Sequence, residues 1–185
     1  IQVVEDINGE ALYAGTELES TLVRFDLKTK RYVDQLRLAD LGLVRFGGPL
    51  HFIEQHPITR RLYFTSGPGH NLFEVDPDTM TLLRSMRLND VVGTALLLDP
   101  DSERIFYQSG GRDALFEIDL ASWTVTRSYQ GELHARRLAL DKRRNALYVL
   151  GHLSGQLIAI DLSTGEHRWR VSVGGRPHGL GMEQD

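Results

Sequence analysis

The sequence predicts an all-β protein made of repeated four-stranded antiparallel sheets, and two observations support that prediction. A short apolar stretch ending in aspartate occurs four times, with spacings of 50, 43 and 42 residues, at Asp26, Asp76, Asp119 and Asp161. Short runs rich in β-favouring residues alternate with turn residues, and no stretch has the apolar period of an amphipathic helix. Four-stranded repeats of about 40 to 50 residues are typical of β-propeller blades.

Other positions recur at fixed distances from these aspartates. Each aspartate is preceded by leucine at four residues and by an aromatic residue at thirteen, Tyr13, Tyr63, Phe106 and Tyr148. Three residues after it come Thr29, Thr79, Ser122 and Thr164. An aspartate followed three residues later by Thr or Ser can close a turn by side-chain to backbone hydrogen bonds. We therefore assign these aspartates a structural role rather than a catalytic one.

The third repeat shows which elements each blade is expected to contain. Its strands are predicted at 95–98, 104–108, 114–119 and 123–129, with turns at 99–101, 110–113 and 121–122. By the same pattern the blades cover approximately 1–38, 49–88, 93–130 and 134–173. We expect the first strand of a blade to be buried on both faces, because it is nearly all apolar, and the outermost strand to alternate.

The pattern continues past the fourth repeat. Residues 1–4 are predicted to form the first strand of blade one, and residues 178–182 the same strand of a next blade, within 177–185. We expect one array of four blades plus the first strand of a fifth, forming part of a larger ring. Further sequence, another chain or self-association would then complete it, because open strand edges invite pairing. The alternative is a closed four-bladed ring with a trailing tail.

Composition excludes several classes of function. The 185 residues carry a formal net charge of −4, so charge gives no case for nucleic-acid or membrane-surface binding. The absence of cysteine excludes disulfides, thiolate metal sites and a cysteine nucleophile. No apolar run approaches the roughly 20 residues of a membrane-spanning helix, so no direct membrane span is expected.

Two segments resemble known propeller families. Residues 173–182, with the sequence VGGRPHGLGM, resemble the junction between blades in the YVTN family of bacterial propeller repeats. The fourth repeat also resembles a quinoprotein blade through Ala159, Asp161, Thr164, Gly165 and Trp169, whereas the positions matching Trp169 hold Asp34, Arg84 and Arg127. The first resemblance implies a bacterial extracytoplasmic protein that is periplasmic, secreted or on the surface. Such propellers include binding modules and enzymes, so the fold alone does not assign a function.

Candidate binding residues gather on one predicted face. In a propeller, the loops that join blades share a face with the loops between second and third strands. This assignment places there His51, His70, Arg112, Asp113, His134, Arg136, His152, Arg176 and His178. Arginine forks and imidazoles could bind an anionic ligand or a partner's carboxylates. The alternative is a rim of solvated residues hydrogen-bonded to strand-end backbone.

A metal site is a weaker alternative at the same face. His51, His134 and His178 begin inner strands and could converge on a zinc-like ion. No carboxylate recurs beside them and no close pair such as His-x-His occurs. We therefore assign no metal and no cofactor.

One loop departs from the repeat because the first interval exceeds the next two by seven or eight residues. The excess falls near 39–48, where apolar residues accompany an arginine: Leu41, Leu43, Val44, Arg45 and Phe46. We expect this loop to project and contact a partner. The alternative is that it folds back to plug the channel or to cover a blade junction.

No catalytic motif stands out. The sequence lacks Gly-x-Ser-x-Gly, and Asp76-x-Asp78 and Asp99-x-Asp101-x-Glu103 are interpreted as turns rather than calcium loops. The leading hypothesis is a non-catalytic propeller module that binds a protein partner or completes a larger assembly. The alternative is a metal-dependent propeller hydrolase of the lactonase or gluconolactonase type, with its site at the channel mouth. The predicted innermost strands offer mostly Val, Leu, Ala and Phe, which disfavours that alternative.

Overall fold

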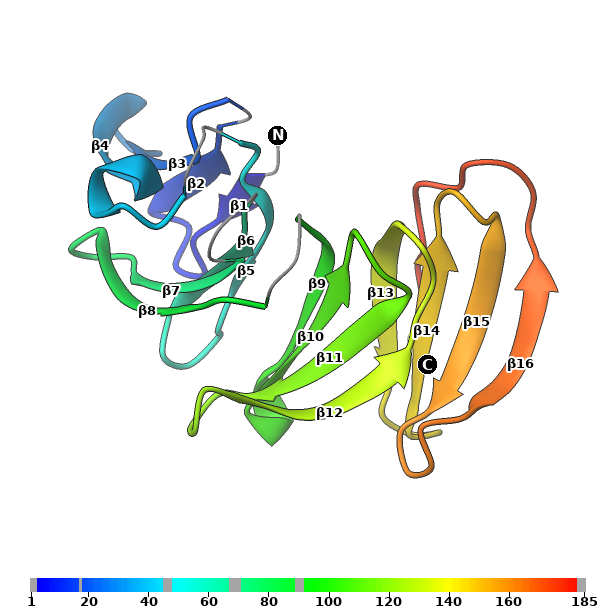
Figure 1. Cartoon of the computed structure of the whole chain (residues 1–185). Coiled ribbons are helices and arrows are strands. Elements are labelled where there is room, and N and C mark those ends of the chain that lie inside the picture. The colour runs from blue at the N-terminus through cyan, green and yellow to red at the C-terminus, as the bar shows by residue number, and fades with distance from the viewer. Residues whose placement is uncertain (1–2, 17, 45–47, 67–70, 89–91, 183–185) are drawn as a thin grey trace. The chain divides into compact units, whose positions relative to one another are not determined.

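The all-β prediction is confirmed. A computed structural model describes residues 3–16, 18–44, 48–66, 71–88 and 92–182. These residues form four antiparallel four-stranded sheets, here called blades 1 to 4, and two short 3₁₀ turns. Figure 1 shows the four strands of each blade side by side in chain order. The chain divides into two compact units, residues 1–93 and 94–185, and each unit is described by itself.

The first unit contains blades 1 and 2. The strands of blade 1 are β1 (Val3–Glu5), β2 (Ala11–Gly15), β3 (Thr21–Asp26) and β4 (Arg31–Arg37), followed by the 3₁₀ turn η1 (Leu38–Leu41). The strands of blade 2 are β5 (His51–Gln55), β6 (Leu62–Thr65), β7 (Leu72–Asp76) and β8 (Thr81–Met86). A buried cluster contributed by both blades, including Leu22, Leu50, Phe64 and Phe73, joins them.

The second unit contains blades 3 and 4. The strands of blade 3 are β9 (Gly93–Asp99), β10 (Arg104–Ser109), β11 (Ala114–Asp119) and β12 (Thr124–Gln130), with the 3₁₀ turn η2 (Pro100–Ser102) after β9. The strands of blade 4 are β13 (Ala135–Asp141), β14 (Ala146–Gly151), β15 (Gln156–Asp161) and β16 (His167–Ser172). A second buried cluster, including Phe106, Leu115, Val149 and Ile158, joins these blades. The strands predicted for the third repeat agree with β9 to β12 within two residues at each end.

The four anchor turns form as predicted. In each, the aspartate Oδ1 accepts the backbone N–H three residues later, at 2.6 Å for Thr29, 3.1 Å for Thr79, 2.7 Å for Ser122 and 3.3 Å for Thr164. The next residue has a left-handed backbone in all four blades, with φ of 56° at Lys30, 51° at Met80, 53° at Trp123 and 85° at Gly165. Each repeat therefore has a left-handed backbone at this position, which is unfavourable for residues other than glycine but is occupied by Lys30, Met80 and Trp123 in three blades.

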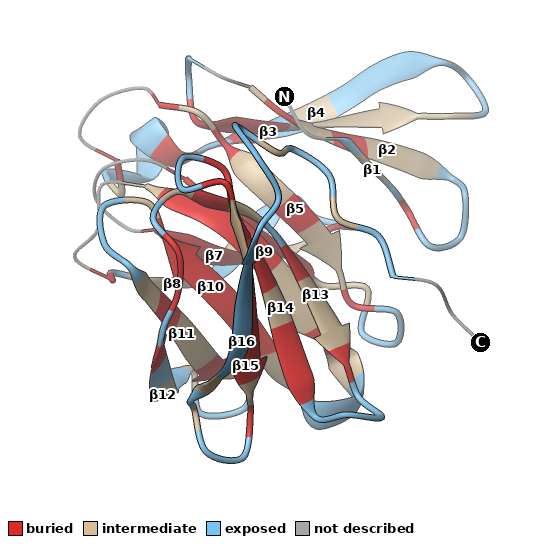
Figure 2. Ribbon diagram, turned by 90° about the vertical axis from the view of Figure 1, so that its right-hand side faces the viewer, coloured by how far each residue is buried: buried red, intermediate tan, exposed pale blue. Residues whose placement is uncertain are grey.

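The prediction for the first strands was wrong in part. Only β9 is largely buried, whereas β1, β5 and β13 are mixed or exposed. The second strands β6, β10 and β14 are the most deeply buried (Figure 2). A first strand forms an edge of its sheet, but a second strand has hydrogen-bonded neighbours on both sides and contributes to the cluster shared with the other blade of its unit. The apolar composition of a strand therefore did not determine its burial.

Residues after β16 carry no assigned strand. Residues 173–182 are exposed or half-buried, although a first strand of a further blade was expected there. Val173 still donates a backbone hydrogen bond to Gly155, but no described strand of this unit pairs with residues 178–182. Arg176 nevertheless has φ of 53°, close to the 55° of His134, which lies 42 residues earlier at the start of blade 4. Within the described part of the chain, no helix is long and apolar enough to cross a membrane.

Candidate functional site

A cross-strand triplet occupies the same register in every blade. The aromatic residue of the second strand pairs with a third-strand residue, which pairs with a fourth-strand residue. The triplets are Tyr13–Arg24–Asp34, Tyr63–Glu74–Arg84, Phe106–Glu117–Arg127 and Tyr148–Ala159–Trp169. Directly opposed residues project from the same face of a sheet, so each triplet forms one stripe across its blade. Three stripes carry opposite charges, and blade 4 carries aromatic residues instead.

Two of these stripes contact the next blade through an arginine. Arg24 pairs with Asp34 through two bonds of 2.9 and 2.8 Å, and its Nη1 also donates to the carbonyl oxygens of Pro77 and Asp78, at 2.7 and 2.9 Å. In the second unit, Arg127 donates to the carbonyl oxygens of Leu162 and Ser163.

The acceptors are equivalent in the two units. Each arginine reaches the first two residues after the anchor aspartate of the following blade, although Arg24 lies on a third strand and Arg127 on a fourth. We call this contact the arginine clamp. It shows that the stripe faces the next blade of its unit.

The stripe of blade 4 is exposed at its outer end, whereas Tyr148 is half-buried and Ala159 is buried. Ile158 and Ile160 belong to the buried cluster shared with blade 3, so strand alternation places Ala159 and its partners on the opposite face. There Tyr148 packs against Trp169 with ring centroids 5.7 Å apart. Trp169 is 42% exposed, and Val171, two residues further along the same face, is 47% exposed. Figure 2 shows β16 exposed over most of its length.

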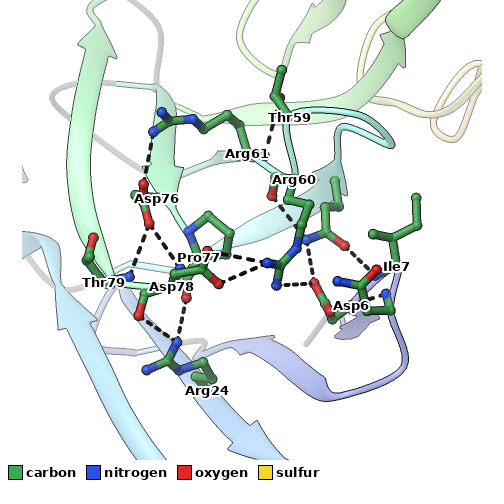
Figure 3. A network of polar contacts seen from close by, with 12 residues as sticks. Asp6, Ile7, Arg24, Thr59, Arg60, Arg61, Asp76, Pro77, Asp78 and Thr79 are labelled. Atoms are coloured by element: carbon green, nitrogen blue, oxygen red, sulfur yellow. Dashed lines mark hydrogen bonds and ion pairs between the residues drawn. The ribbon is translucent and has the colours of Figure 1, made fainter.

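A polar network joins blades 1 and 2 through residues that follow β1, that link β5 to β6 and that link β7 to β8 (Figure 3). The side chain of Asp6 is fully buried, and its Oδ1 accepts from Gln55 at 2.8 Å and from Arg60 Nη2 at 3.2 Å. Arg60 Nη1 lies 3.1 Å from Asp78 Oδ1, so one guanidinium bridges two carboxylates. The left-handed backbone of Arg60 does not mark it as special, because the equivalent Glu103 and Asn145 share it.

The hydrogen bonds in this network lower the pKa of Asp6. Burial raises the pKa of this carboxyl, but donation from Gln55, from the Asn8 backbone and from Arg60 outweighs that effect. The pKa of Asp6 is therefore held below its ordinary value, and the carboxylate remains ionised. Beside it, burial first and the charge of Asp6 second raise the pKa of the Tyr13 hydroxyl.

The predicted histidines mostly contact nearby backbone or aromatic rings. His134 Nδ1 lies 3.3 Å from the Gly110 carbonyl oxygen, and His152 Nδ1 lies 3.2 Å from that of Pro177. The rings of His152 and His178 are brought together with centroids 4.4 Å apart. His51 starts β5 in the other unit, with its ring 5.8 Å from Phe52, and His70 lies outside the described residues.

The predicted arginines are exposed or half-buried. Arg112 is exposed, with its guanidinium 5.6 Å from the Phe116 ring centre, and Asp113 and Arg176 are exposed as well. Arg136 is half-buried, and its Nε has no hydrogen-bond partner. Among the described residues, no group of three His, Cys, Asp or Glu side chains is arranged to hold a metal ion.

The long loop of blade 1 folds back over the blade junction instead of projecting throughout. Val44 is 7% exposed in the buried cluster of the first unit, and Leu43 packs against that cluster. Leu41 remains 47% exposed at the end of η1. Arg45 and Phe46 lie outside the described residues. Val44 is thus a core residue and Leu43 a partly buried neighbour of the core, which favours the alternative that this loop covers a blade junction.

The sequence did not point to the Asp6–Arg60 network or to the arginine clamps. The sequence does contain a pattern that includes the clamp arginines. Residues of opposite charge stand two positions before and eight positions after the anchor aspartate in three of the four repeats. Trp169 was recognised as the odd member of that series, but not as the exposed end of a stripe.

Comparison with known proteins supports the propeller fold. No protein-family model matches the chain, and no curated protein sequence matches it. Among solved structures, it is similar to hydrazine synthase of Kuenenia stuttgartiensis, with a TM-score of 0.73, 15% identity and 91% of this chain covered. It is also similar to a chain in the crystal structure of the mitotic checkpoint complex, with a TM-score of 0.73, 14% identity and 94% covered. The chain spans 47% and 51% of these two chains, about half of each.

Proposed function

We propose that this chain is a non-catalytic β-propeller module that engages a protein partner, and so completes a larger assembly, through the exposed face of blade 4. The observation that supports it is the pair of exposed residues Trp169 and Val171, with the half-buried Tyr148 packed against Trp169. In each unit, the stripe of the preceding blade is covered by the next four-stranded sheet. The partner that this geometry favours is therefore another four-stranded blade of the same repeat type.

The chemistry of the stripe supports an apolar contact. Blades 1 and 3 use a guanidinium, whereas blade 4 offers an indole, a phenol ring and a valine. The arginines beside Trp169 are neutralised, because Arg168 pairs with Asp161 at 2.7 Å and Arg170 with Glu132 at 2.9 Å. Burial of exposed aromatic and valine surface drives association at roughly 25 cal/mol per Å². A structural neighbour belonging to a multiprotein complex accords with this proposal, and no observation of the described residues favours the hydrolase.

Sedimentation velocity tests the proposal, with a second copy of the chain supplying the partner blade. We expect concentration-dependent self-association that the Trp169→Lys/Val171→Lys variant weakens at least tenfold. Val125→Lys is the matched control, because Val125 also lies on an outer strand and is also 42% exposed. A chain that remains monomeric up to about 100 µM, or equal association of the two variants, would overturn the proposal.

A further inference from the structure

The first unit contains a pocket of about 240 Å³ lined by residues of blades 1 and 2. Its charged lining consists of four carboxylates and two guanidiniums, from Asp6, Glu10, Asp26, Asp78, Arg24 and Arg60. The formal charge of this lining is therefore negative. Both guanidiniums are already engaged, Arg24 by Asp34 and two carbonyl oxygens and Arg60 by Asp6 and Asp78. Because both guanidiniums already have partners, the pocket is poorly suited to bind an anion.

Two carboxylates of the pocket lining remain available to a cation. Glu10 is exposed and its side chain makes no hydrogen bond or ion pair with any described residue. Asp26 Oδ1 accepts from Thr29, and its carboxylate still lines the pocket. A positively charged group entering the pocket would therefore find two carboxylates that no guanidinium neutralises.

The hydroxyl of a buried tyrosine is the second, independent observation. Tyr13 is 1% exposed and lines the pocket, and its hydroxyl has no hydrogen-bond partner among the described residues. Asp6, Arg24, Arg60 and Asp78 line the same pocket as Tyr13. The hydroxyl is not one of the fully enclosed polar atoms that lack a partner, so its oxygen is accessible from the pocket.

The triplet sequence explains why this hydroxyl is unpaired. In blade 2 the equivalent Tyr63 hydroxyl donates to Glu74, directly across the strands, at 3.2 Å. In blade 1 the residue across from Tyr13 is Arg24, which has donors only and is held by Asp34. The exchange of acid and base between the third and fourth strands therefore leaves the Tyr13 oxygen available to a ligand.

We propose that this pocket binds a small organic cation, an ammonium or guanidinium group. The Tyr13 oxygen accepts a hydrogen bond from the cation, and the carboxylates of Glu10 and Asp26 pair with its charge. Phe25 also lines the pocket and offers an aromatic ring to the cation. A small free amine and a lysine or arginine side chain of a partner protein share this chemistry. The pocket has no residue in common with the exposed stripe of blade 4, so this proposal and the proposed function fail independently.

Titration of the ¹⁵N-labelled chain, followed by amide chemical shifts, tests the site. Agmatine, which carries a guanidinium and an ammonium, represents the free cation, and acetyl-Gly-Arg-Gly-amide represents a side chain. We expect saturable shifts in residues 10–13 and 24–26, with affinity lowered about three- to tenfold by Tyr13→Phe and by Glu10→Gln. Glu19→Gln is the matched control, because it removes an exposed carboxylate of the same unit outside the pocket.

The outcomes separate the sources and the chemistry. Binding of agmatine alone identifies a free cation, and binding of the peptide as well identifies a side chain as a ligand. 4-Guanidinobutyrate replaces the ammonium of agmatine by a carboxylate and should bind more weakly. Absence of saturable shifts with both cations, tighter binding of 4-guanidinobutyrate, or equal effects of Glu10→Gln and Glu19→Gln would each overturn the proposal.

Discussion

Each anchor aspartate acts mainly on its own turn, so its contribution can be isolated at the level of one residue. At Asp119 the Ser122 hydroxyl and then the Ser122 backbone N–H donate to the same carboxylate oxygen, and they lower the pKa of Asp119. The pKa values of Asp26 and Asp76 are lowered mainly by hydrogen bonds within their turns, and that of Asp161 is lowered first by Arg168 and then by its turn. Hydrogen bonds to the charged form favour that form.

The direction of the acid response follows from these shifts. A carboxyl with a lowered pKa in the folded state contributes stability above its unfolded pKa, which is about 3.9, and loses that contribution as the pH falls through the folded value. We expect Asp119→Asn to lower the urea midpoint at pH 7, and the difference from the unsubstituted chain to shrink below about pH 4. Asp40→Asn, at an exposed carboxylate of η1 without a described partner, should show no such convergence. A constant difference between pH 7 and pH 2.5 would contradict this assignment.

At the scale of the element, the blade junction of the second unit depends on Arg127. Its guanidinium donates to two carbonyl oxygens of the next blade and lies 5.2 Å from the Tyr129 ring centre. Arg127→Met keeps most of the aliphatic volume but leaves these carbonyl oxygens without that donor. We expect a loss of about 1–3 kcal/mol in the free energy of unfolding, measured by urea denaturation. Arg176→Met removes an exposed arginine of the same unit and should change it by less than about 0.5 kcal/mol. Equal losses in the two variants would argue against the clamp.

The strands and anchor turns could be predicted because their determinants are local. Asp-x-x-Thr or Asp-x-x-Ser lies within four residues, and β-favouring runs ended by Asp99-Pro100-Asp101 need no distant contact. The clamps could not be predicted in this way, because Arg24 bonds residues more than fifty positions away. The loop at 43–44 was ambiguous for a related reason, since an apolar residue fits both a core and an exposed contact. The binding roles predicted for the histidines and arginines remain predictions.

At the scale of the whole molecule, protection should follow strand position rather than apolar composition. The second strands β6, β10 and β14 are buried and hydrogen-bonded on both sides, whereas β4 and β16 are edges with mostly exposed residues. We expect hydrogen-exchange mass spectrometry to find the slowest amides in β6, β10 and β14 and the fastest strand amides in β4 and β16. Slower exchange in β13 than in β14 would contradict this order, because the first strand would then be better protected than the second.

The exchange of acid and base between blades 1 and 3 has a consequence for how such proteins diverge. A comparison that scores positions singly finds arginine against glutamate on the third strand and aspartate against arginine on the fourth. It counts two mismatches where the fold conserves one contact, the donation of an arginine to the next blade. Selection on this contact acts on the pair, and a change at one position alone places like charges face to face. Such repeats can therefore lose recognisable sequence similarity in coupled steps while the junction between their blades stays the same.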